Sequence, residues 1–145
     1  MQKRSRNNPS LDNVVVHLLH RVSQRADELF VKEVGNADLT PRQFVVLLSV
    51  AESDAPSQTD LVETTGIDRS TIAEMVRRMA KRRLLQRRRS RKDARAYVVQ
   101  LTDAGREVLK ATEPKALRTD TAVLACLNGE QRRVFVETLK IISGS

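Results

Sequence analysis

Residues 57–82, SQTDLVETTGIDRSTIAEMVRRMAKR, contain two short helix patterns on either side of a glycine. The first begins at Ser57, a residue type that caps helix N-termini, and ends at Gly66, a residue type that commonly follows helix C-termini. Asp68 caps the second pattern, which runs to about Arg82 with apolar residues at helical spacing. These inward residues are Ile72, Met75, Val76 and Met79. Two short helices joined through a glycine-containing turn predict a helix-turn-helix.

Two helices are expected before this unit. Apolar residues recur mostly every three or four positions over residues 11–34, which predicts a long helix there. The sequence TPRQ at residues 40–43 combines an N-cap threonine, a proline at the first helical position and a glutamine placed to close a capping box. A second helix is therefore expected from Pro41 to about Glu52.

After Leu84 the periodicity changes from helical to strand-like. Residues 85–90 and 95–101 form two short runs, the second of which alternates apolar and polar side chains. The polar residues 91–94 lie between them, as in a β-hairpin with an exposed tip. The expected fold class is mainly α with a small β-hairpin wing beside the helix-turn-helix.

Two further helices are expected to close the chain, from Asp103 to about Leu127 and over about residues 130–142. Glu113-Pro114 should kink or interrupt the first, because proline lacks a backbone donor. The last helix carries more apolar surface than a domain of 145 residues is expected to cover unaided. Its apolar residues are Val134, Phe135, Leu139, Ile141 and Ile142.

The positive charge is concentrated in one segment. The chain has a formal charge of +8, but residues 69–95 alone carry twelve cations against Glu74 and Asp93, and the remainder carries a net −2. A charge run can be merely a solvated face, but here the signs are not mixed. A polyanion would relieve the repulsion and release counterions. Nucleic acid is favoured over a membrane surface, because the segment lacks a broad apolar face.

Composition excludes other classes. Aromatic residues are 3% of the chain and the five glycines are at least fifteen positions apart, so neither a base-stacking sheet nor a phosphate-binding loop is expected. One cysteine and two histidines cannot form a four-ligand zinc site or a recognisable catalytic set. We expect no enzyme, cofactor or metal, and a buried, unreactive Cys126. Lys3, Arg4 and Arg6 precede polar residues instead of an apolar run, so a cytoplasmic protein without a membrane anchor is expected.

The second helix of the helix-turn-helix should enter the major groove of double-stranded DNA, with its first turns facing the bases. The polar residues early enough for base contact are Arg69, Ser70, Thr71, Glu74 and Arg77. Arg78 comes later and should hold the phosphate backbone. For Ser70, support of the helix cap is nearly as good an interpretation as base contact.

The hairpin should reach the neighbouring minor groove or phosphates. Arg91 and Lys92 occupy the expected tip, and Arg95 leaves it. Asp93 is expected to orient the Arg95 guanidinium. Because Arg87 to Arg89 alternate faces along a strand, at least one should point away from DNA.

The sequence also resembles a known family. In order and spacing, the MarR family of winged helix-turn-helix regulators is matched over about residues 39–109. The matching segments are LTPRQF (39–44), QTDL (58–61), TGIDRST (65–71), DARA (93–96) and LTDAGR (101–106). One departure is Arg83, where the family commonly has glycine, so we expect the turn into the hairpin to differ in shape and Arg83 to add a phosphate contact.

The resemblance implies a single domain over residues 1–145 that forms an obligate homodimer. Residues 11–34 and 103–142 would supply the dimerisation helices, and residues 40–101 the DNA-binding lobe. Such a dimer would bind a pseudo-palindromic operator and usually repress a nearby gene. A constitutive architectural or nucleoid protein without an effector is the alternative.

The resemblance further implies release from DNA by a small anionic aromatic ligand, such as an aromatic acid or its coenzyme A thioester. Candidate ligand residues are His17, His20, Arg21 and Gln24, which lie on adjoining turns of the first helix. A solvated or interfacial polar edge is the competing interpretation of these four residues.

Overall fold

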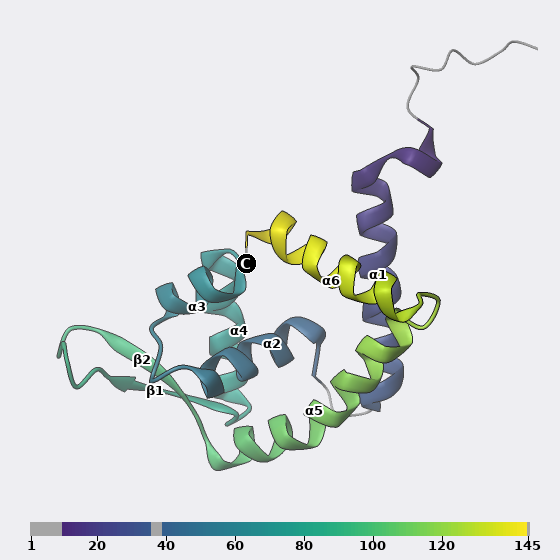
Figure 1. The fold of residues 1–145 in the computed structure, drawn as a ribbon. Helices are drawn as coiled ribbons and strands as arrows, with labels where there is room; N and C mark the ends of the chain where they lie inside the picture. Colours follow the sequence, from purple (N-terminus) through teal and green to yellow (C-terminus); the bar gives the residue numbers. More distant parts are fainter. Residues whose placement is uncertain (1–9, 36–38, 145) are drawn as a thin grey trace, which may run out of the picture.

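The computed structural model describes residues 10–35 and 39–144, and its described part is mainly helical with one two-stranded hairpin (Figure 1). Lys3, Arg4 and Arg6 lie outside the described residues. The elements are a 3-10 turn (Leu11–Asn13), α1 (Val15–Val34), α2 (Pro41–Glu52), α3 (Gln58–Thr65), α4 (Arg69–Lys81), β1 (Leu85–Arg89), β2 (Tyr97–Leu101), α5 (Asp103–Val123) and α6 (Gly129–Ser143). The expected fold class is confirmed.

The elements gather at two ends of the molecule. Helices α2, α3 and α4 and the hairpin form a lobe, whereas α1 lies at the other end, and α6 runs from that end back toward the lobe (Figure 1). Helix α1 is tied to α5 where Lys115 Nζ donates to the Val34 carbonyl at 3.2 Å and Arg118 Nε pairs with Glu33 at 3.0 Å. Helix α5 starts directly after β2, so it connects the two ends.

The predicted helix starts in the lobe are confirmed. The Gln43 N–H donates to Thr40 Oγ1 at 3.2 Å, and the Thr40 N–H donates to Gln43 Oε1 at 3.0 Å, which completes a capping box. Ser57 and Asp60 form the same reciprocal pair at the start of α3. Helix α3 ends at Gly66, whose φ of 68° is left-handed and therefore suits glycine.

The core of the lobe is aliphatic. The antiparallel hairpin pairs Leu85 with Leu101 and Arg89 with Tyr97, so its apolar end packs under the helices while its arginine-rich end extends outward. Of the expected inward residues of α4, Met75 is only partly buried against this core, as are Phe44 and Leu48 of α2. The fully buried side chains of the core include Val46, Leu47, Leu61, Ile72, Val76, Met79, Leu85 and Val99.

Two expectations for the region after the lobe were wrong, namely the interruption of α5 at Pro114 and the burial of Cys126. Helix α5 continues through Pro114 without interruption and ends at Val123, earlier than Leu127. The helix stays intact around Pro114 because it packs along α1, and tertiary packing can outweigh the loss of one backbone hydrogen-bond donor. Cys126 is exposed, since it lies in the turn between α5 and α6 and not on a helical inner face.

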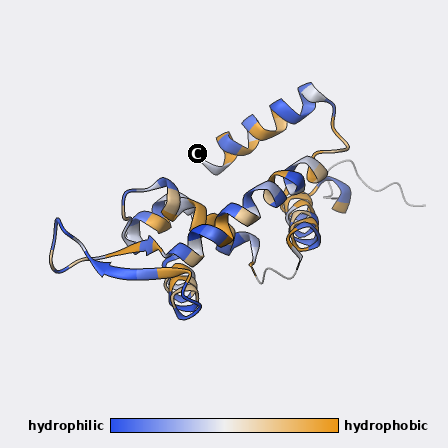
Figure 2. Cartoon of the chain, turned by 90° about the horizontal axis from the view of Figure 1, so that it is seen from below, coloured by the Kyte–Doolittle hydropathy of each residue, from blue (hydrophilic) through white to orange (hydrophobic). Residues whose placement is uncertain are grey.

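Helices α1 and α6 expose much apolar surface. No residue of α6 is buried, and Figure 2 shows hydrophobic colouring that recurs along its ribbon. The largest exposures of apolar residues in these two helices are those of Ile141 on α6, at 80%, and Val15 on α1 and Ile142 on α6, each at 66%. Within residues 10–35 and 39–144, no helix combines the length and hydropathy needed to cross a bilayer.

Candidate nucleic-acid interface

The start of α4 is built around Asp68. Its carboxylate accepts the Thr71 N–H at 2.9 Å and the hydroxyls of Ser70 and Thr71, each at 2.6 Å. These bonds, led by that from Ser70, hold the pKa of Asp68 well below its usual range. Both hydroxyls therefore support the cap, including that of Thr71, for which sequence reasoning had favoured base contact. Their oxygens still have lone pairs that can accept a further hydrogen bond.

One turn later, Glu74 pairs with two arginines. Arg77 Nε and Nη2 donate to its two carboxylate oxygens at 2.9 and 2.8 Å, and Arg78 Nε donates to Oε1 at 2.6 Å. The hydrogen bond from Arg77, then that from Arg78, lowers the pKa of Glu74 to about 2. The three side chains remain 42–66% exposed, so they are presented to solvent as one charged cluster.

Arg69 stands at the first position of α4 and reaches back to the preceding helix. Its Nη2 lies 3.4 Å from Thr59 Oγ1 on α3. The predicted base-facing residues Arg69, Ser70, Thr71, Glu74 and Arg77 thus all lie on the first three turns of α4, and Arg78 follows them.

The tip of the hairpin is closed by side chains that bond to the backbone. Ser90 Oγ accepts the N–H groups of Lys92 and Asp93 at 3.1 and 3.3 Å. Asp93 Oδ1 accepts the backbone N–H of Arg95 at 2.9 Å. Asp93 therefore shapes the turn and does not orient the Arg95 guanidinium, because a carboxylate naturally closes on the N–H two residues ahead. Arg91, Lys92 and Arg95 are all exposed at this tip.

Sequence reasoning missed a cation–π cluster on the hairpin, formed by one tyrosine and two arginines. The guanidinium carbons of Arg87 and Arg89 lie 5.0 and 5.6 Å from the centre of the Tyr97 ring, within cation–π range. Arg89 Nη1 also donates to the Ala94 carbonyl at 2.9 Å. The strand register could have revealed this cluster, because it places Tyr97 opposite Arg89. The cluster gives two of the strand arginines a defined position.

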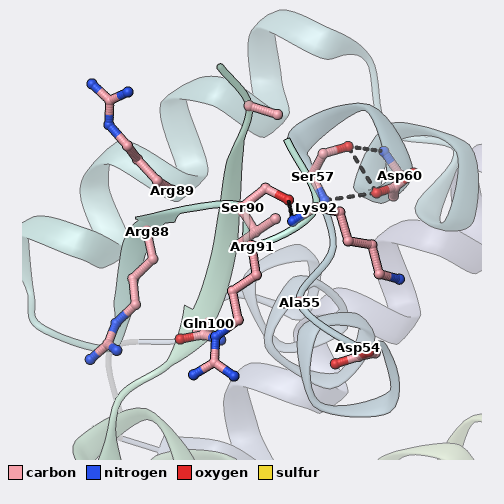
Figure 3. Close-up of a pocket in the computed structure, with 12 residues that line it drawn as sticks. Asp54, Ala55, Ser57, Asp60, Arg88, Arg89, Ser90, Arg91, Lys92 and Gln100 are labelled. Atoms are coloured by element: carbon pink, nitrogen blue, oxygen red, sulfur yellow. Dashed lines mark hydrogen bonds between the residues drawn. The ribbon is translucent and has the colours of Figure 1, made fainter. Parts of the chain in front are cut away.

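A hollow of about 560 Å³ lies between the hairpin and the turn that joins α2 to α3 (Figure 3). Arg88, Arg91 and Lys92 line its hairpin side, and Asp54 and Asp60 line the other. The Ser57 hydrogen bonds lower the pKa of Asp60. Cations and carboxylates thus face one another across an open, polar surface.

The root of the hairpin depends on two backbone features. Arg83 has a φ of 59°, in the left-handed region, and it closes α4 through bonds from its N–H to the Ala80 carbonyl and from the Leu84 N–H to the Met79 carbonyl. This is the helix C-terminus in which glycine is usual. Arg83 takes the glycine-like conformation itself, so the expected change in the shape of the turn is not observed. At Gly105 on α5, any Cβ would overlap the Leu84 carbonyl oxygen.

The candidate ligand residues lie together on α1 but not in the hollow described above. His17 is half-buried, whereas His20, Arg21 and Gln24 are exposed, and Gln24 Nε2 donates to Glu28 at 3.3 Å. Among the described residues, no group of three or more histidine, cysteine or acidic side chains could hold a metal ion.

A helix-turn-helix with an exposed second helix, followed by a basic hairpin, defines a winged helix-turn-helix of the kind that binds DNA. Known proteins specify the family. The model of the MarR family matches residues 37–96. The transcriptional repressor NicR of Pseudomonas putida is 31% identical over 126 residues, which are 87% of this chain and 80% of NicR. The chain belongs to the MarR family and is a transcriptional regulator of the MarR type.

Two solved structures extend this similarity. BpsR of Bordetella bronchiseptica, described with regulation of its DNA binding by 6-hydroxynicotinic acid, superposes with a TM-score of 0.90 at 30% identity, covering 96% of this chain and 99% of BpsR. The repressor CouR, bound to a 23-mer DNA duplex, superposes with a TM-score of 0.83 at 28% identity, covering 94% of this chain and 99% of CouR.

Proposed function

We propose that this chain is a sequence-specific regulator that binds double-stranded DNA as a homodimer and represses transcription until a small ligand releases it. One observation carries the proposal: the exposed face of α4 and the adjacent hairpin lie on one lobe and hold all of the excess positive charge. Such a surface suits a polyanion with a groove. Because DNA is the partner, we propose a cytoplasmic location.

The residue roles follow from position. Arg77 can fork onto guanine and Arg78 can hold a phosphate, while Asp93 keeps the hairpin tip in shape. The proposed base-facing residues are Arg69, Ser70, Thr71, Glu74 and Arg77, and the proposed minor-groove or phosphate contacts are Arg91, Lys92 and Arg95.

A homodimer accounts for the apolar surface at the other end of the molecule. Val15, Val16 and Val22 of α1 and Ile141 and Ile142 of α6 are between 43% and 80% exposed. A second copy could cover both helices through a two-fold axis, which would present two α4 helices to half-sites about one helical turn apart. Sedimentation of the purified chain tests this directly, and a monomer at binding concentrations would contradict it.

The DNA-binding proposal is tested by footprinting on the DNA upstream of its own gene and by competition against random duplex. We expect protection of a paired site. Arg77→Ala should weaken operator binding by roughly tenfold or more and relax preference at one base pair per half-site, whereas Arg95→Ala should weaken binding through the hairpin. Lys110→Ala, which removes an exposed cation from α5, is the control. Uniform protection would instead favour the architectural protein.

The description of BpsR supports an aromatic acid as the releasing ligand, whereas its coenzyme A thioester rests on the family resemblance alone. The candidate contacts are His17, His20, Arg21 and Gln24. BpsR is described with 6-hydroxynicotinic acid, and PcaV of Streptomyces coelicolor, at 29% identity and a TM-score of 0.87 over 95% of this chain and 97% of PcaV, with its natural ligand. A thermal-shift screen of aromatic acids that begins with 6-hydroxynicotinic acid tests the proposal, because a ligand that binds only the folded state raises Tm. Arg21→Ala should abolish the shift. An unchanged shift in that variant would move the site elsewhere.

A further inference from the structure

Glu74 is the only acidic residue of α4 and stands in the middle of its cationic face. The other acid of residues 69–95, Asp93, is occupied in the hairpin turn. Glu74 is instead directed at two of the arginines on its own helix, and it contacts no residue of another element through a hydrogen bond that the described part of the chain records.

The pairing changes what the helix presents to DNA. Arg77 commits Nε and Nη2 to the carboxylate, and Arg78 commits Nε. The cluster therefore carries one net positive charge where two free arginines would carry two. Exposed ion pairs on a helix contribute little to folding stability. The main effect of Glu74 should consequently be on binding.

The cluster should weaken binding to non-specific DNA. Affinity for random duplex comes almost entirely from cations on phosphates. A carboxylate among those cations repels phosphates and competes for the arginine donors, and it does so for every sequence. The low pKa of Glu74 keeps the carboxylate charged throughout the neutral range.

A matching site can compensate for this cost. A glutamate in the major groove accepts a hydrogen bond from cytosine N4, and an arginine beside it forks onto guanine. We infer that Glu74 is a specificity-determining residue, which suppresses binding to random DNA by occupying Arg77 and Arg78 and permits binding where a cytosine meets its carboxylate. The inference rests on the proposed function and deepens it.

The test is Glu74→Gln, which preserves shape and removes the charge. The probes are a pool of random duplexes of about 25 base pairs, long enough for two half-sites, and the duplexes that the wild-type protein enriches from that pool. We expect the affinity of the variant for the random pool to rise about tenfold. Its salt dependence there should steepen by about 0.9 in log–log slope for each arginine that gains a phosphate. Preference for the enriched duplexes should fall roughly tenfold or more, with loss of cytosine selection at one position per half-site.

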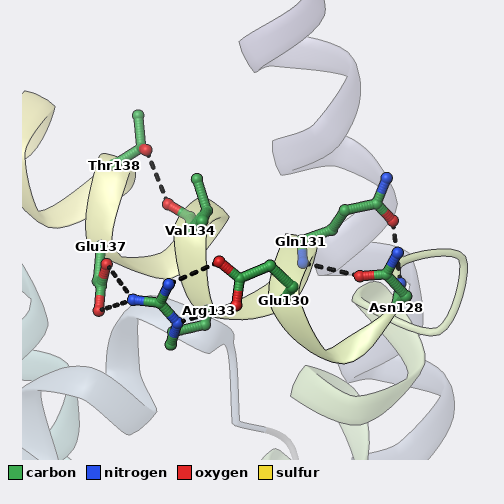
Figure 4. Close-up of polar contacts among 7 residues, drawn as sticks. All are labelled: Asn128, Glu130, Gln131, Arg133, Val134, Glu137 and Thr138. Atoms are coloured by element: carbon green, nitrogen blue, oxygen red, sulfur yellow. Dashed lines mark hydrogen bonds and ion pairs between the residues drawn. The ribbon is translucent and has the colours of Figure 1, made fainter.

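Glu137→Gln is the matched control. Glu137 accepts both of its hydrogen bonds from Arg133 on α6, at 3.1 and 3.2 Å, so the change removes the same charge and a similar ion pair away from the lobe (Figure 4). It should leave the preference unchanged. An unchanged preference in Glu74→Gln, or an equal change in Glu137→Gln, would overturn the inference while the wild type still enriches a sequence. A wild type that enriches none would overturn the proposed function, and the inference with it.

Discussion

Replacing Gly105 with alanine adds one methyl group where α5 closely approaches the backbone at the root of the hairpin. The first turn of α5 lies against the root of the hairpin, and an added Cβ would overlap the Leu84 carbonyl oxygen and lie 3.0 Å from its carbon and 3.3 Å from Leu101 Cδ2. Ordinary contacts between carbon atoms are about 3.5–4.0 Å. Since a carbonyl group cannot rotate away like a side chain, α5 and the hairpin root must separate.

The size of the effect follows from opposing contributions. Overpacking of this kind costs about 1–3 kcal/mol. The same oxygen accepts the Thr102 N–H at 3.1 Å, and weakening this bond costs up to about 1 kcal/mol, whereas the Thr102 hydroxyl donates mainly to the Arg83 carbonyl at 2.5 Å. Alanine recovers about 1 kcal/mol of helix propensity. We expect Gly105→Ala to lower the free energy of unfolding by about 1–3 kcal/mol, and Tm by roughly 3–10 °C.

Thermal and urea unfolding followed by circular dichroism, at one protomer concentration, measure this change. Gly129→Ala is the control, because Gly129 is also helical but nothing lies within 4 Å of an added Cβ. It should be neutral or stabilising by up to about 1 kcal/mol. A Gly105→Ala variant as stable as the wild type would refute the argument from close approach, since helix propensity would then dominate.

Four further outcomes are expected. Arg83→Gly should raise the free energy of unfolding by up to about 1 kcal/mol in urea titrations, because relief of the left-handed φ outweighs the added backbone entropy of the unfolded chain; a clear loss would contradict the strain. Asp68→Asn should flatten the acid side of the stability profile. The lowered pKa of Asp68 means that its contribution to the free energy of unfolding is complete above the unfolded-state pKa of about 3.9 and is lost as pH falls through the folded-state pKa. Urea unfolding at a series of pH values should therefore show a difference between the variant and the wild type above the unfolded-state pKa and none below the folded-state pKa. Tyr97→Leu should weaken DNA binding in competition assays by releasing Arg87 and Arg89, whereas Tyr97→Phe should retain it because the ring remains; equal losses would count against the ring. Wild-type affinity should fall by orders of magnitude between about 50 and about 200 mM salt, and a flat response would contradict phosphate neutralisation.

Much of the fold could be predicted because its signals are local. The start of α2 at Pro41, the left-handed end of α3 at Gly66 and the capped start of α4 after Asp68 all depend on groups three or four residues apart. The hairpin followed from a change of period, and the charge segment could be counted directly. The helix ends lie within one turn of chain, where side-chain identity alone determines which hydrogen bonds form.

The errors came from residues whose surroundings are set by distant parts of the chain. Pro114 is accommodated because α5 packs along α1, and Cys126 is exposed because α5 ends before reaching it. Asp93 is a local exception, because its carboxylate accepts the backbone N–H of Arg95 two residues ahead. The spacing of residues in the sequence could not predict the positions of Pro114 and Cys126, because each depends on the balance between a local preference and contacts with other parts of the chain.

Local pattern therefore established the helices, the hairpin and the cationic segment of this regulator. Packing between distant segments decided how they are presented: the contact of Gly105 with Leu84, the Tyr97 ring between two arginines, and the apolar faces of α1 and α6 left uncovered. The physical reason is the separation along the chain of the groups that interact. Hydrogen bonds across one turn depend on neighbours in sequence, whereas close approach and burial depend on which surfaces the completed chain brings together.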